Sequence, residues 1–297
     1  MKRNGRLSVA VLGAGLIGVD LVSKVMRSSP LDLQLVVGRD ERTPGLRQAS
    51  RLGLRTATDG IRSLTDIEEP FDVAFDATNA MSHAEHAELL APLGTVLIDL
   101  TPSKVGQMVV PTVNGLEATA YRDVNMISCG GQASIPLLHA IARQHRIDYV
   151  EVVTTAASLS VGHSTRLNLD EYVETTQDAV RDFTGVKDVK AILNLSPARP
   201  PATFRVAMSL LGDNLTQESV GALVANAADG VRAFVGGYDV TACTVNDGRA
   251  FIAVEVTARG DLIPKYAGNI DIINSAALHV AEQYAVGRLS AMDVERS

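Results

Sequence analysis

Cys129 is the residue whose type and setting best fit covalent chemistry. It stands in "NMISCGGQAS", residues 125–134, between a short apolar run and a pair of glycines. A helix that starts near Ser134, with Pro136 tolerated in its first turn, would direct a partial positive charge at the sulfur and favour the thiolate. The other interpretation is a small core residue beside a tight turn, because cysteines are among the most buried residue types. The local sequence leaves both interpretations open.

The second cysteine and a pair of histidines give weaker signals. Cys243 lies in an alternating, strand-like run without a glycine beside it, and we interpret it as structural. The two cysteines are far apart in unlike contexts, which argues against a disulfide framework or a zinc cluster. His83 and His86, at positions i and i+3, are interpreted as a solvated helix face. No metal site is predicted, because the histidines lack a ligand spacing such as HExxH.

A glycine-rich turn near the N-terminus has the pattern of a dinucleotide-binding site. The apolar strand from Leu7 to Leu12 is followed by Gly13-x-Gly15-x-x-Gly18 and then by a helix with apolar residues on one side. In such a turn the first glycine allows the tight bend, the second lets a pyrophosphate approach the backbone, and the third lets helix and strand pack closely. A structural turn without a ligand is the alternative interpretation, since glycine turns are common.

A carboxylate follows at the distance that a dinucleotide fold requires. Asp40 comes 22 residues after Gly18, at the end of the next strand-like run, "LDLQLVVGRD". Its carboxylate can accept a hydrogen bond from a ribose 2′-hydroxyl, so NAD is the expected cofactor. Arg39 beside it could instead meet a 2′-phosphate, which keeps NADP open.

Alternating strand-like and helical runs predict the fold class. The apolar runs "DVAFDAT" and "TVLIDLT" flank the helical segment "SHAEHAELLAPLG", which is the βαβ rhythm of a parallel sheet. We therefore predict an α/β protein with a Rossmann-type, doubly wound parallel sheet in a dinucleotide-binding domain over residues 1–128. Residues 129–268 change rhythm, with longer strands and a helix at "LDEYVETTQDAVRDF", which predicts an α+β substrate or assembly domain. A C-terminal helix over residues 269–286 is expected to return to the first domain.

Composition and charge limit the expected partners. The 297 residues carry a formal net charge of −7 with a pI near 5.4, and they show no basic stripe of the kind that binds a phosphate backbone. We therefore expect no nucleic acid partner. The sequence shows neither a signal-like apolar segment nor a run of roughly 18 uninterrupted apolar residues. This predicts a cytoplasmic protein without a membrane anchor.

Six segments together resemble one enzyme family. They are "GAGLIG", "DLTPSKVG", "VPTVN", "NMISCGGQASIP", "STRLNLDEYVETT" and "YAGNIDIINSAAL", in order over nearly the whole chain. They are similar to segments of the acylating acetaldehyde dehydrogenases, the coenzyme-A-dependent partners of 4-hydroxy-2-oxovalerate aldolases in aromatic meta-cleavage pathways. The resemblance implies that the Cys129 thiol attacks a short-chain aldehyde, gives a hemithioacetal, and becomes a thioester when hydride passes to the nicotinamide. The acyl group then moves to coenzyme A.

The resemblance also implies cofactor contacts and an assembly. The expected contacts come from the glycine turn, from the strand end after it, from a second loop and from the "GNID" segment. They are Gly13, Ala14, Gly15, Leu16, Ile17, Gly18 and Asp40, then Ser160, Val161, Gly162, His163, Ser164, Thr165, Arg166, Leu167 and Asn168, and finally Asn269. The expected assembly is a homodimer, or a heterotetramer with a 4-hydroxy-2-oxovalerate aldolase subunit.

Three positions depart from the family's pattern. Val206, in "PPATFRVAMSL", stands where an aspartate that polarises the cysteine is expected. His163 replaces a proline in a loop that usually reads "SAGPGTR", and Leu16 replaces an asparagine in the first turn. His163 is therefore either a substitute base that acts on Cys129 or an exposed loop histidine. Two alternative functions stay open: a related oxidoreductase of aldehydes or acyl thioesters in another pathway, and an impaired homologue that binds an aldolase partner.

Overall fold

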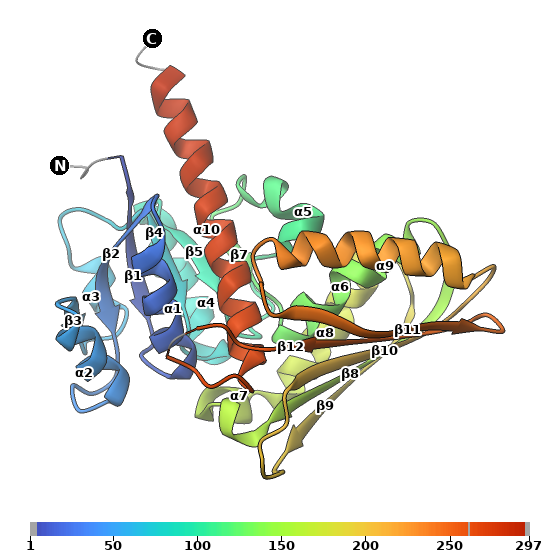
Figure 1. Cartoon of the computed structure of the whole chain (residues 1–297). Coiled ribbons are helices and arrows are strands. Elements are labelled where there is room, and N and C mark those ends of the chain that lie inside the picture. Colours follow the sequence, from blue (N-terminus) through green and yellow to red (C-terminus); the bar gives the residue numbers. More distant parts are fainter. Residues whose placement is uncertain (1–4, 261, 295–297) are drawn as a thin grey trace. The chain divides into compact units, whose positions relative to one another are not determined.

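The chain divides into two compact units, each described here by itself (Figure 1). The computed structural model describes residues 5–260 and 262–294. Unit 1 is Met1–Met126 with Asn274–Ser297, and unit 2 is Ile127–Ile273. Within the described residues, no helix is both long and apolar enough to cross a bilayer.

Unit 1 is built on a parallel sheet, with seven strands in the described residues. The strand order is β3-β2-β1-β4-β5-β7-β6. Strands β1, β4 and β5 are buried on both faces, which is why they appear in the sequence as continuous apolar runs. The order reverses between β1 and β4, as in a dinucleotide-binding fold, and the predicted doubly wound α/β class is confirmed. The strands are β1 (Leu7–Leu12), β2 (Leu31–Val37), β3 (Arg55–Ala57), β4 (Val73–Asp76), β5 (Val96–Asp99), β6 (Gln107–Met108) and β7 (Asp123–Asn125).

The helices of unit 1 include one that comes from the far end of the sequence. Those from the first part of the chain are α1 (Leu16–Arg27), α2 (Pro44–Arg51), α3 (Arg62–Thr65), α4 (Ala80–Leu90), the 3₁₀ turn η1 (Ala91–Leu93) and α5 (Pro111–Ala118). The last helix, α10 (Gly268–Val294), is longer than the expected 269–286. The Asn274 amide on α10 donates to the Ile17 carbonyl at 3.0 Å and to the Asp20 carboxylate at 2.9 Å. From Asn274 onward, α10 is thus a part of unit 1.

Unit 2 is built on a mixed sheet in the order β11-β12-β10-β8-β9. Strands β8 and β9 are parallel, and the other neighbouring pairs are antiparallel. Burial alternates along β10 and β12, so that one face of the sheet is covered and the other is open. The predicted α+β class of this part is confirmed. The strands are β8 (Ile147–Ala157), β9 (Asp188–Ser196), β10 (Phe204–Gly212), β11 (Tyr238–Asn246) and β12 (Arg249–Val256).

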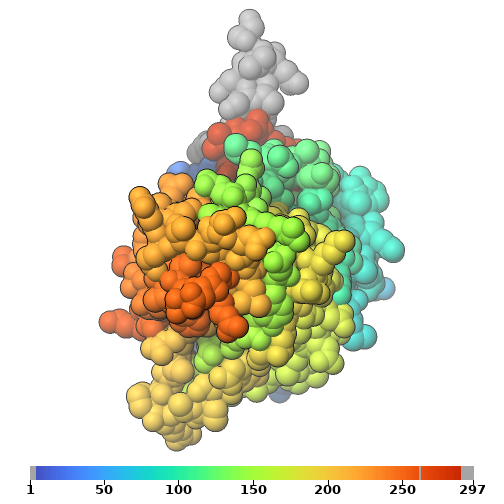
Figure 2. All heavy atoms as spheres, turned by 90° about the vertical axis from the view of Figure 1, so that its right-hand side faces the viewer, coloured from blue at the N-terminus to red at the C-terminus, as the bar shows by residue number. Residues whose placement is uncertain are grey.

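Helices pack on one face of the unit 2 sheet. They are α6 (Cys129–Ala142), α8 (Leu169–Thr184) and α9 (Gln217–Arg232), while the 3₁₀ turn η2 (Ser158–Ser160) and the short α7 (His163–Leu167) follow β8. In Figure 2 the orange α9 region lies against the green segment near residue 146. Two hydrogen bonds join these segments, from Asp213 N to Arg146 O at 3.1 Å and between His145 Nε2 and Ser219 Oγ at 2.7 Å.

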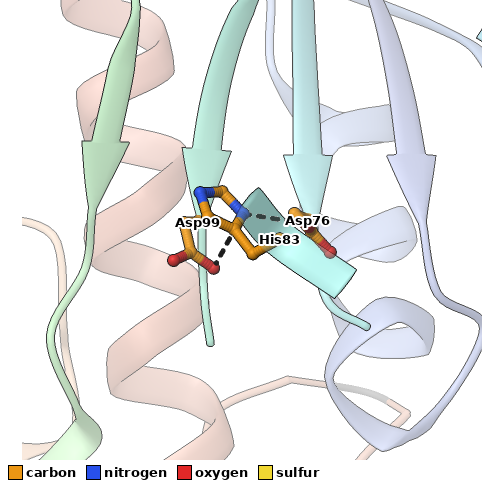
Figure 3. Close-up of side chains that lie close together, drawn as sticks. All are labelled: Asp76, His83 and Asp99. Atoms are coloured by element: carbon orange, nitrogen blue, oxygen red, sulfur yellow. Dashed lines mark hydrogen bonds and ion pairs between the residues drawn. The ribbon is translucent and has the colours of Figure 1, made fainter. Parts of the chain in front are cut away.

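His83 and His86 do not form a solvated helix face, and that expectation was wrong. They are 0% and 7% exposed, because α4 turns them toward the carboxyl ends of the parallel strands. There they meet Asp76 at the end of β4 and Asp99 at the end of β5 (Figure 3), and His83 also meets Asp123, the first residue of β7. We call these five residues the carboxylate–histidine cluster. His83 Nδ1 lies 2.9 Å from Asp76 and 3.5 Å from Asp99, and its Nε2 lies 3.2 Å from Asp123. His86 Nδ1 lies 2.7 Å from Asp76.

The cluster holds a buried cation between carboxylates. Burial opposes a charge on His83, but hydrogen bonds with Asp123 and Asp76 outweigh it and raise the pKa of the imidazole to about 10. Burial likewise favours the neutral form of Asp76, yet hydrogen bonds with the two histidines hold its pKa well below the usual range. Burial raises the pKa of Asp99 to about 7. A pKa of about 10 favours the protonated ring near neutral pH, and in that form both ring nitrogens of His83 can donate to the carboxylates beside them.

The cluster predicts a specific pH dependence of stability. Replacing His83 with leucine removes the cation from between buried carboxylates and should lower the unfolding free energy by about 3–5 kcal/mol near pH 6. The folded wild type keeps the His83 proton up to a pKa of about 10, whereas the unfolded chain releases it near its ordinary value of about 6.5. His83 should therefore make stability fall between these two values, by up to about 1.4 kcal/mol per pH unit. His83→Leu should lack this part of the slope.

Urea unfolding at about pH 6, 8 and 9.5, followed by circular dichroism, measures the difference between wild type and variant. His145→Gln is the matched control, because that histidine lies in unit 2 and its ring bonds to the Ser219 hydroxyl rather than to a carboxylate. The control should keep the wild-type slope. If wild type and His83→Leu show the same dependence of unfolding free energy on pH, the proton that the folded protein holds in this range belongs to a group other than His83.

Candidate active site

The helix that carries Cys129 begins at the cysteine itself. Ser128 is the N-cap of α6, and its Oγ accepts a hydrogen bond from Gly131 N at 2.9 Å. The expected start near Ser134 was therefore wrong, and Pro136 lies inside the helix rather than in its first turn. The two glycines after Cys129 have low helix propensity, but the hydrogen bond of the Ser128 cap compensates and allows the helix to begin here. The sulfur consequently lies at the end of α6 where unpaired N–H groups concentrate.

The thiol lies against the hydroxyl of a tyrosine from α8. Cys129 Sγ is 3.2 Å from Tyr172 Oη, and the same oxygen accepts a hydrogen bond from Gly130 N at 2.9 Å. Burial raises the pKa of the Cys129 thiol to about 11, although the Tyr172 hydroxyl and the first N–H groups of α6 act to lower it. The expectation that the helix end favours the thiolate is thus outweighed in the free protein by desolvation. Part of the cysteine is still accessible to solvent.

Val206 lies on the covered face of the unit 2 sheet, close to the residues that surround the thiol. It is 0% exposed on β10 and is paired directly with Thr154 of β8. Residues directly opposite in an antiparallel pair point to the same face of the sheet. Thr154 Oγ1 would lie 2.3 Å from a Cβ added at Gly130, so that face meets the start of α6. An apolar side chain therefore stands where the family pattern led us to expect a carboxylate.

The second predicted cofactor segment forms a compact turn in unit 2. Ser160, at the end of η2, is buried, and its carbonyl accepts a hydrogen bond from the Asn269 side-chain amide at 3.0 Å. Asn269 Oδ1 is buried and has no hydrogen-bond partner among the described residues. His163 is exposed at the first position of α7 and makes no described hydrogen bond to Cys129. The structure thus brings Asn269 to the loop, while the role of His163 as a base stays a prediction.

The glycine turn of unit 1 has the shape that its spacing predicts. Gly13 has φ of +102°, and a Cβ there would lie 2.5 Å from the Ala77 carbonyl oxygen. A Cβ at Gly18 would lie 1.8 Å from the Gly13 carbonyl oxygen, so helix and turn touch. Gly15 caps α1 without a side chain, and a Cβ added there would meet open space within 4 Å. The turn therefore leaves room for a pyrophosphate in front of the first N–H groups of α1.

Asp40 follows β2 at the surface and is already paired with an arginine. The partner is Arg42, whose Nη2 lies 2.8 Å from Asp40 Oδ2, rather than the neighbouring Arg39. Hydrogen bonds with the Arg42 side chain and backbone lower the pKa of the Asp40 carboxyl. A ribose hydroxyl and Arg42 can share the two oxygens of this carboxylate, because each oxygen has more than one lone pair. Sequence reasoning considered only Arg39 and missed Arg42.

Tyr172, Thr154 and Thr176 also escaped the sequence analysis. The sequence analysis placed Tyr172 only inside the helix expected at "LDEYVETTQDAVRDF", without a role of its own. A tyrosine in a buried helical stripe needs a partner for its hydroxyl, and that requirement was the available signal. The sequence does not show which partner the fold supplies.

One described group has the spacing of metal ligands. Atoms of Asp76, His83 and Asp99 lie within 4.8 Å of one another (Figure 3). Both ring nitrogens of His83 are occupied by carboxylates, and one of them would have to lose its proton to bind a metal. The imidazolium already provides the positive charge at this position, and the geometry supports an ion-pair cluster.

Comparison with known proteins agrees with the resemblance seen in the sequence. Residues 129–264 match the family described as "Prokaryotic acetaldehyde dehydrogenase, dimerisation". An acetaldehyde dehydrogenase of Streptomyces griseus is 55% identical over 97% of this chain and 94% of its own. One of Burkholderia pseudomallei is 42% identical over 97% of this chain and 98% of its own.

A solved structure shares the fold at low sequence identity. The crystal structure of aspartate semialdehyde dehydrogenase II complexed with ASA, from Vibrio cholerae, has a TM-score of 0.65 and 16% identity, over 97% of this chain and 99% of that one. At this identity the likeness concerns the two-domain fold alone. The identity and coverage of the acetaldehyde dehydrogenases are far higher, and the chain belongs to the acetaldehyde dehydrogenase family.

Proposed function

We propose that the protein oxidises a short-chain aldehyde to its acyl-coenzyme A with NAD, or catalyses the reverse reduction, through a thioester on Cys129. The observation that carries the proposal is the position of the thiol. It is the first residue of α6, partly accessible, and within hydrogen-bond distance of a phenol that stays protonated. The names of the relatives, acetaldehyde dehydrogenases, support a small aldehyde as the substrate.

The chemistry follows from sulfur as nucleophile and leaving group. The Cys129 thiolate attacks the carbonyl carbon, a C–S bond forms, and the carbonyl oxygen carries the negative charge of a hemithioacetal. Loss of hydride from that carbon restores the C=O bond and leaves a thioester on Cys129. The thiolate of coenzyme A then attacks the thioester carbon, and the C–S bond to Cys129 breaks. The first N–H groups of α6 stabilise the sulfur anion at the beginning and the end of this cycle.

The glycine turn and Asp40 support the choice of cofactor. When bound, NAD supplies the acceptor for the hydride. Gly13, Gly15 and Gly18 leave the backbone open to a pyrophosphate, and Asp40 offers an acceptor to a ribose hydroxyl. In unit 2, the Ser160–Asn168 loop and Asn269 are proposed as further contacts on the basis of the family resemblance. The unpaired, buried Asn269 Oδ1 is available to accept a hydrogen bond from a ligand amide.

A second candidate function has one observation in its favour. Burial raises the pKa of the thiol to about 11, and apolar Val206 stands where the family pattern has an aspartate, so the free protein contains little thiolate near neutral pH. An impaired homologue that keeps the fold and binds an aldolase subunit would have this property. Steady-state assays with acetaldehyde, propionaldehyde and butyraldehyde, NAD and coenzyme A distinguish the two, because only the enzyme forms NADH.

We also propose that a second copy of the chain covers the open face of the unit 2 sheet. The family description names dimerisation for residues 129–264, which include all five strands. The open face combines exposed apolar side chains, Leu211 at 39% and Phe251 at 43%, with ion pairs such as Arg205–Glu255 at 2.8 Å. A mixture of apolar and paired charged groups is typical of dimer interfaces. An aldolase subunit bound to this homodimer is a further proposal, which co-purification would test.

The nucleophile assignment predicts a selective loss of function. Cys129→Ala should reduce aldehyde oxidation by at least about 10³-fold, because no covalent intermediate can form, and should change the dissociation constant of NADH by less than about twofold. The absorbance of NADH formed over time measures the oxidation rate, and a fluorescence titration measures the dissociation constant of NADH. Cys243→Ala is the matched control, since it removes the other partly accessible thiol and should keep full turnover. Turnover by Cys129→Ala would assign the chemistry to another residue.

Asp40 and Arg42 predict opposite effects on cofactor preference. The wild type should bind NADH more tightly than NADPH, because a carboxylate repels a 2′-phosphate. Asp40→Asn should lower the ratio of the NADPH to the NADH dissociation constant by about five- to tenfold. The change removes the repulsion between the carboxylate and the 2′-phosphate, and it frees Arg42 to bind that phosphate. Arg42→Ala should widen the ratio by removing a cation that attracts phosphate. Fluorescence titrations with both dinucleotides give the ratios, and tighter binding of NADPH by the wild type would contradict the assignment of Asp40.

The proposed interface predicts how the protein dissociates. Phe251→Asp places a charge on the open face of the sheet and should raise the dimer dissociation constant by at least about tenfold. Leu116→Asp, at a position 80% exposed in unit 1, is the control and should leave the dimer intact. Sedimentation velocity over a concentration series measures both. A dimer unaffected by Phe251→Asp would place the interface elsewhere.

A further inference from the structure

Among the described residues, the hydroxyl of Tyr172 lies within hydrogen-bond distance of the Cys129 sulfur. Tyr172 is 5% exposed on α8, and its Oη lies 3.2 Å from Sγ. An α8 residue one turn later, Thr176, bonds to Ser128 Oγ at 2.7 Å, so the N-cap of α6 is tied to the same helix. These two contacts on neighbouring turns leave the phenol little freedom to move away from the sulfur.

A glycine, Gly130, leaves the space that the Tyr172 hydroxyl occupies. A Cβ added at Gly130 would lie 2.7 Å from Tyr172 Oη and 2.3 Å from Thr154 Oγ1. Both distances are below what a real Cβ shows, and the backbone of Gly130 can approach the phenol only because it lacks a side chain. The first turn of α6 therefore accommodates the hydroxyl at this position.

The hydrogen bonds of the phenol determine the direction of its bond to the sulfur. A phenol has one proton to donate and can accept two hydrogen bonds. Tyr172 Oη accepts from Gly130 N at 2.9 Å, and a hydrogen bond with Thr154 acts to lower the pKa of Tyr172, as expected when Thr154 donates. With both acceptor positions used, the phenol proton is left for Sγ. Burial and the neighbouring sulfur raise the pKa of Tyr172 well above its usual value, so the phenol is a donor at neutral pH and not a base.

We propose that Tyr172 is a catalytic residue, which donates a hydrogen bond to the Cys129 thiolate when it attacks and again when it leaves. The inference rests on the proposed function for its place in the reaction, but the contact with the sulfur stands on geometry. No proton is transferred in this role, so the covalent steps balance as written above. The interaction stabilises the anion relative to the neutral thiol and makes ionisation easier than burial alone would allow.

Among the described residues near the sulfur, no other side chain is placed to donate a hydrogen bond to it. Ser128 and Thr176 are bonded to each other, and Thr176 Oγ1 also donates to the Tyr172 carbonyl at 2.7 Å. Val206, on the sheet face beneath, is apolar. The polar side chains that face this position from α8 and β8, which are Tyr172, Thr176 and Thr154, carry no charge near neutral pH. The remaining contributors to the pKa of the thiol are the backbone N–H groups of Cys129 and Gly130.

The test measures the ionisation of the thiol without using the enzymatic reaction. All variants carry Cys243→Ala, so that iodoacetamide reports on Cys129 alone. Below the pKa of the thiol, the alkylation rate is proportional to the thiolate fraction. Tyr172→Phe should lower the rate at about pH 7.5–9.5 roughly tenfold, which corresponds to a rise of about one unit in the pKa of the thiol. The kcat/KM for the aldehyde should fall by about the same factor, with the dissociation constant of NADH unchanged.

Tyr238→Phe is the matched control. Its hydroxyl is also buried and donates to the carbonyl of Ala133 in the same helix, at 2.7 Å, but it does not contact Cys129. It should change the alkylation rate by less than about twofold. Thr154→Val provides a second variant in case Tyr172→Phe fails to fold. Because it removes a donor to the phenol oxygen, it should shift the rate in the same direction by a smaller factor.

The outcomes separate this inference from the proposed function. An unchanged alkylation rate in folded Tyr172→Phe, or in Thr154→Val when Tyr172→Phe does not fold, would overturn the role of Tyr172. An equal drop in Tyr238→Phe would also overturn it, because the effect would then be one of helix packing. If the wild type forms no NADH from any aldehyde while Tyr172→Phe still slows alkylation, the proposed function fails and the hydrogen bond to the thiolate stands.

Discussion

One hydrogen bond, from the Gly130 N–H to the Tyr172 hydroxyl, ties the start of α6 to α8. It satisfies a first-turn donor that has no partner within the helix, and it holds the phenol against the sulfur. A second hydrogen bond, between Ser128 and Thr176, ties the N-cap of α6 to the next turn of α8. The Cys129 thiol is therefore positioned by a capped helix end and a neighbouring helix. A side chain at position 130 would separate the two helices and remove the site along with the contact.

The two units treat charge in opposite ways. Unit 1 gathers three carboxylates around the buried His83, two of them at the carboxyl ends of β4 and β5 and one at the start of β7, and these groups pair with one another. Unit 2 surrounds Cys129 with uncharged groups, and burial raises the pKa of its thiol to about 11, so little of it is ionised near neutral pH. In the first unit, pH acts on stability. In the second, pH acts on the amount of nucleophile, so the two effects can be measured separately.

The sequence predicted what periodicity and spacing control. The parallel sheet was visible because its strands are buried on both faces, and the glycine turn and Asp40 were found from their spacing along one βαβ unit. Spacing alone did not show which side of α4 faces the sheet, and His83 was therefore assigned to solvent. The start of α6 was missed because its cap acts against the low helix propensity of its glycines. Arg42 and Tyr172 matter through contacts that only the folded backbone creates.

The discontinuity of unit 1 in the sequence has a consequence for synthesis. The ribosome completes the whole of unit 2, residues 127–273, before it makes the segment of α10 that unit 1 requires. Until then the carbonyl of Ile17 and the carboxylate of Asp20 lack Asn274, and the carbonyls of Ala118 and Tyr121 lack the Tyr284 hydroxyl. The part of the chain made first thus finishes folding last. A ribosome that stalls just after residue 273 would carry a complete unit 2 joined to an unfinished unit 1, a state in which incomplete packing invites chaperones.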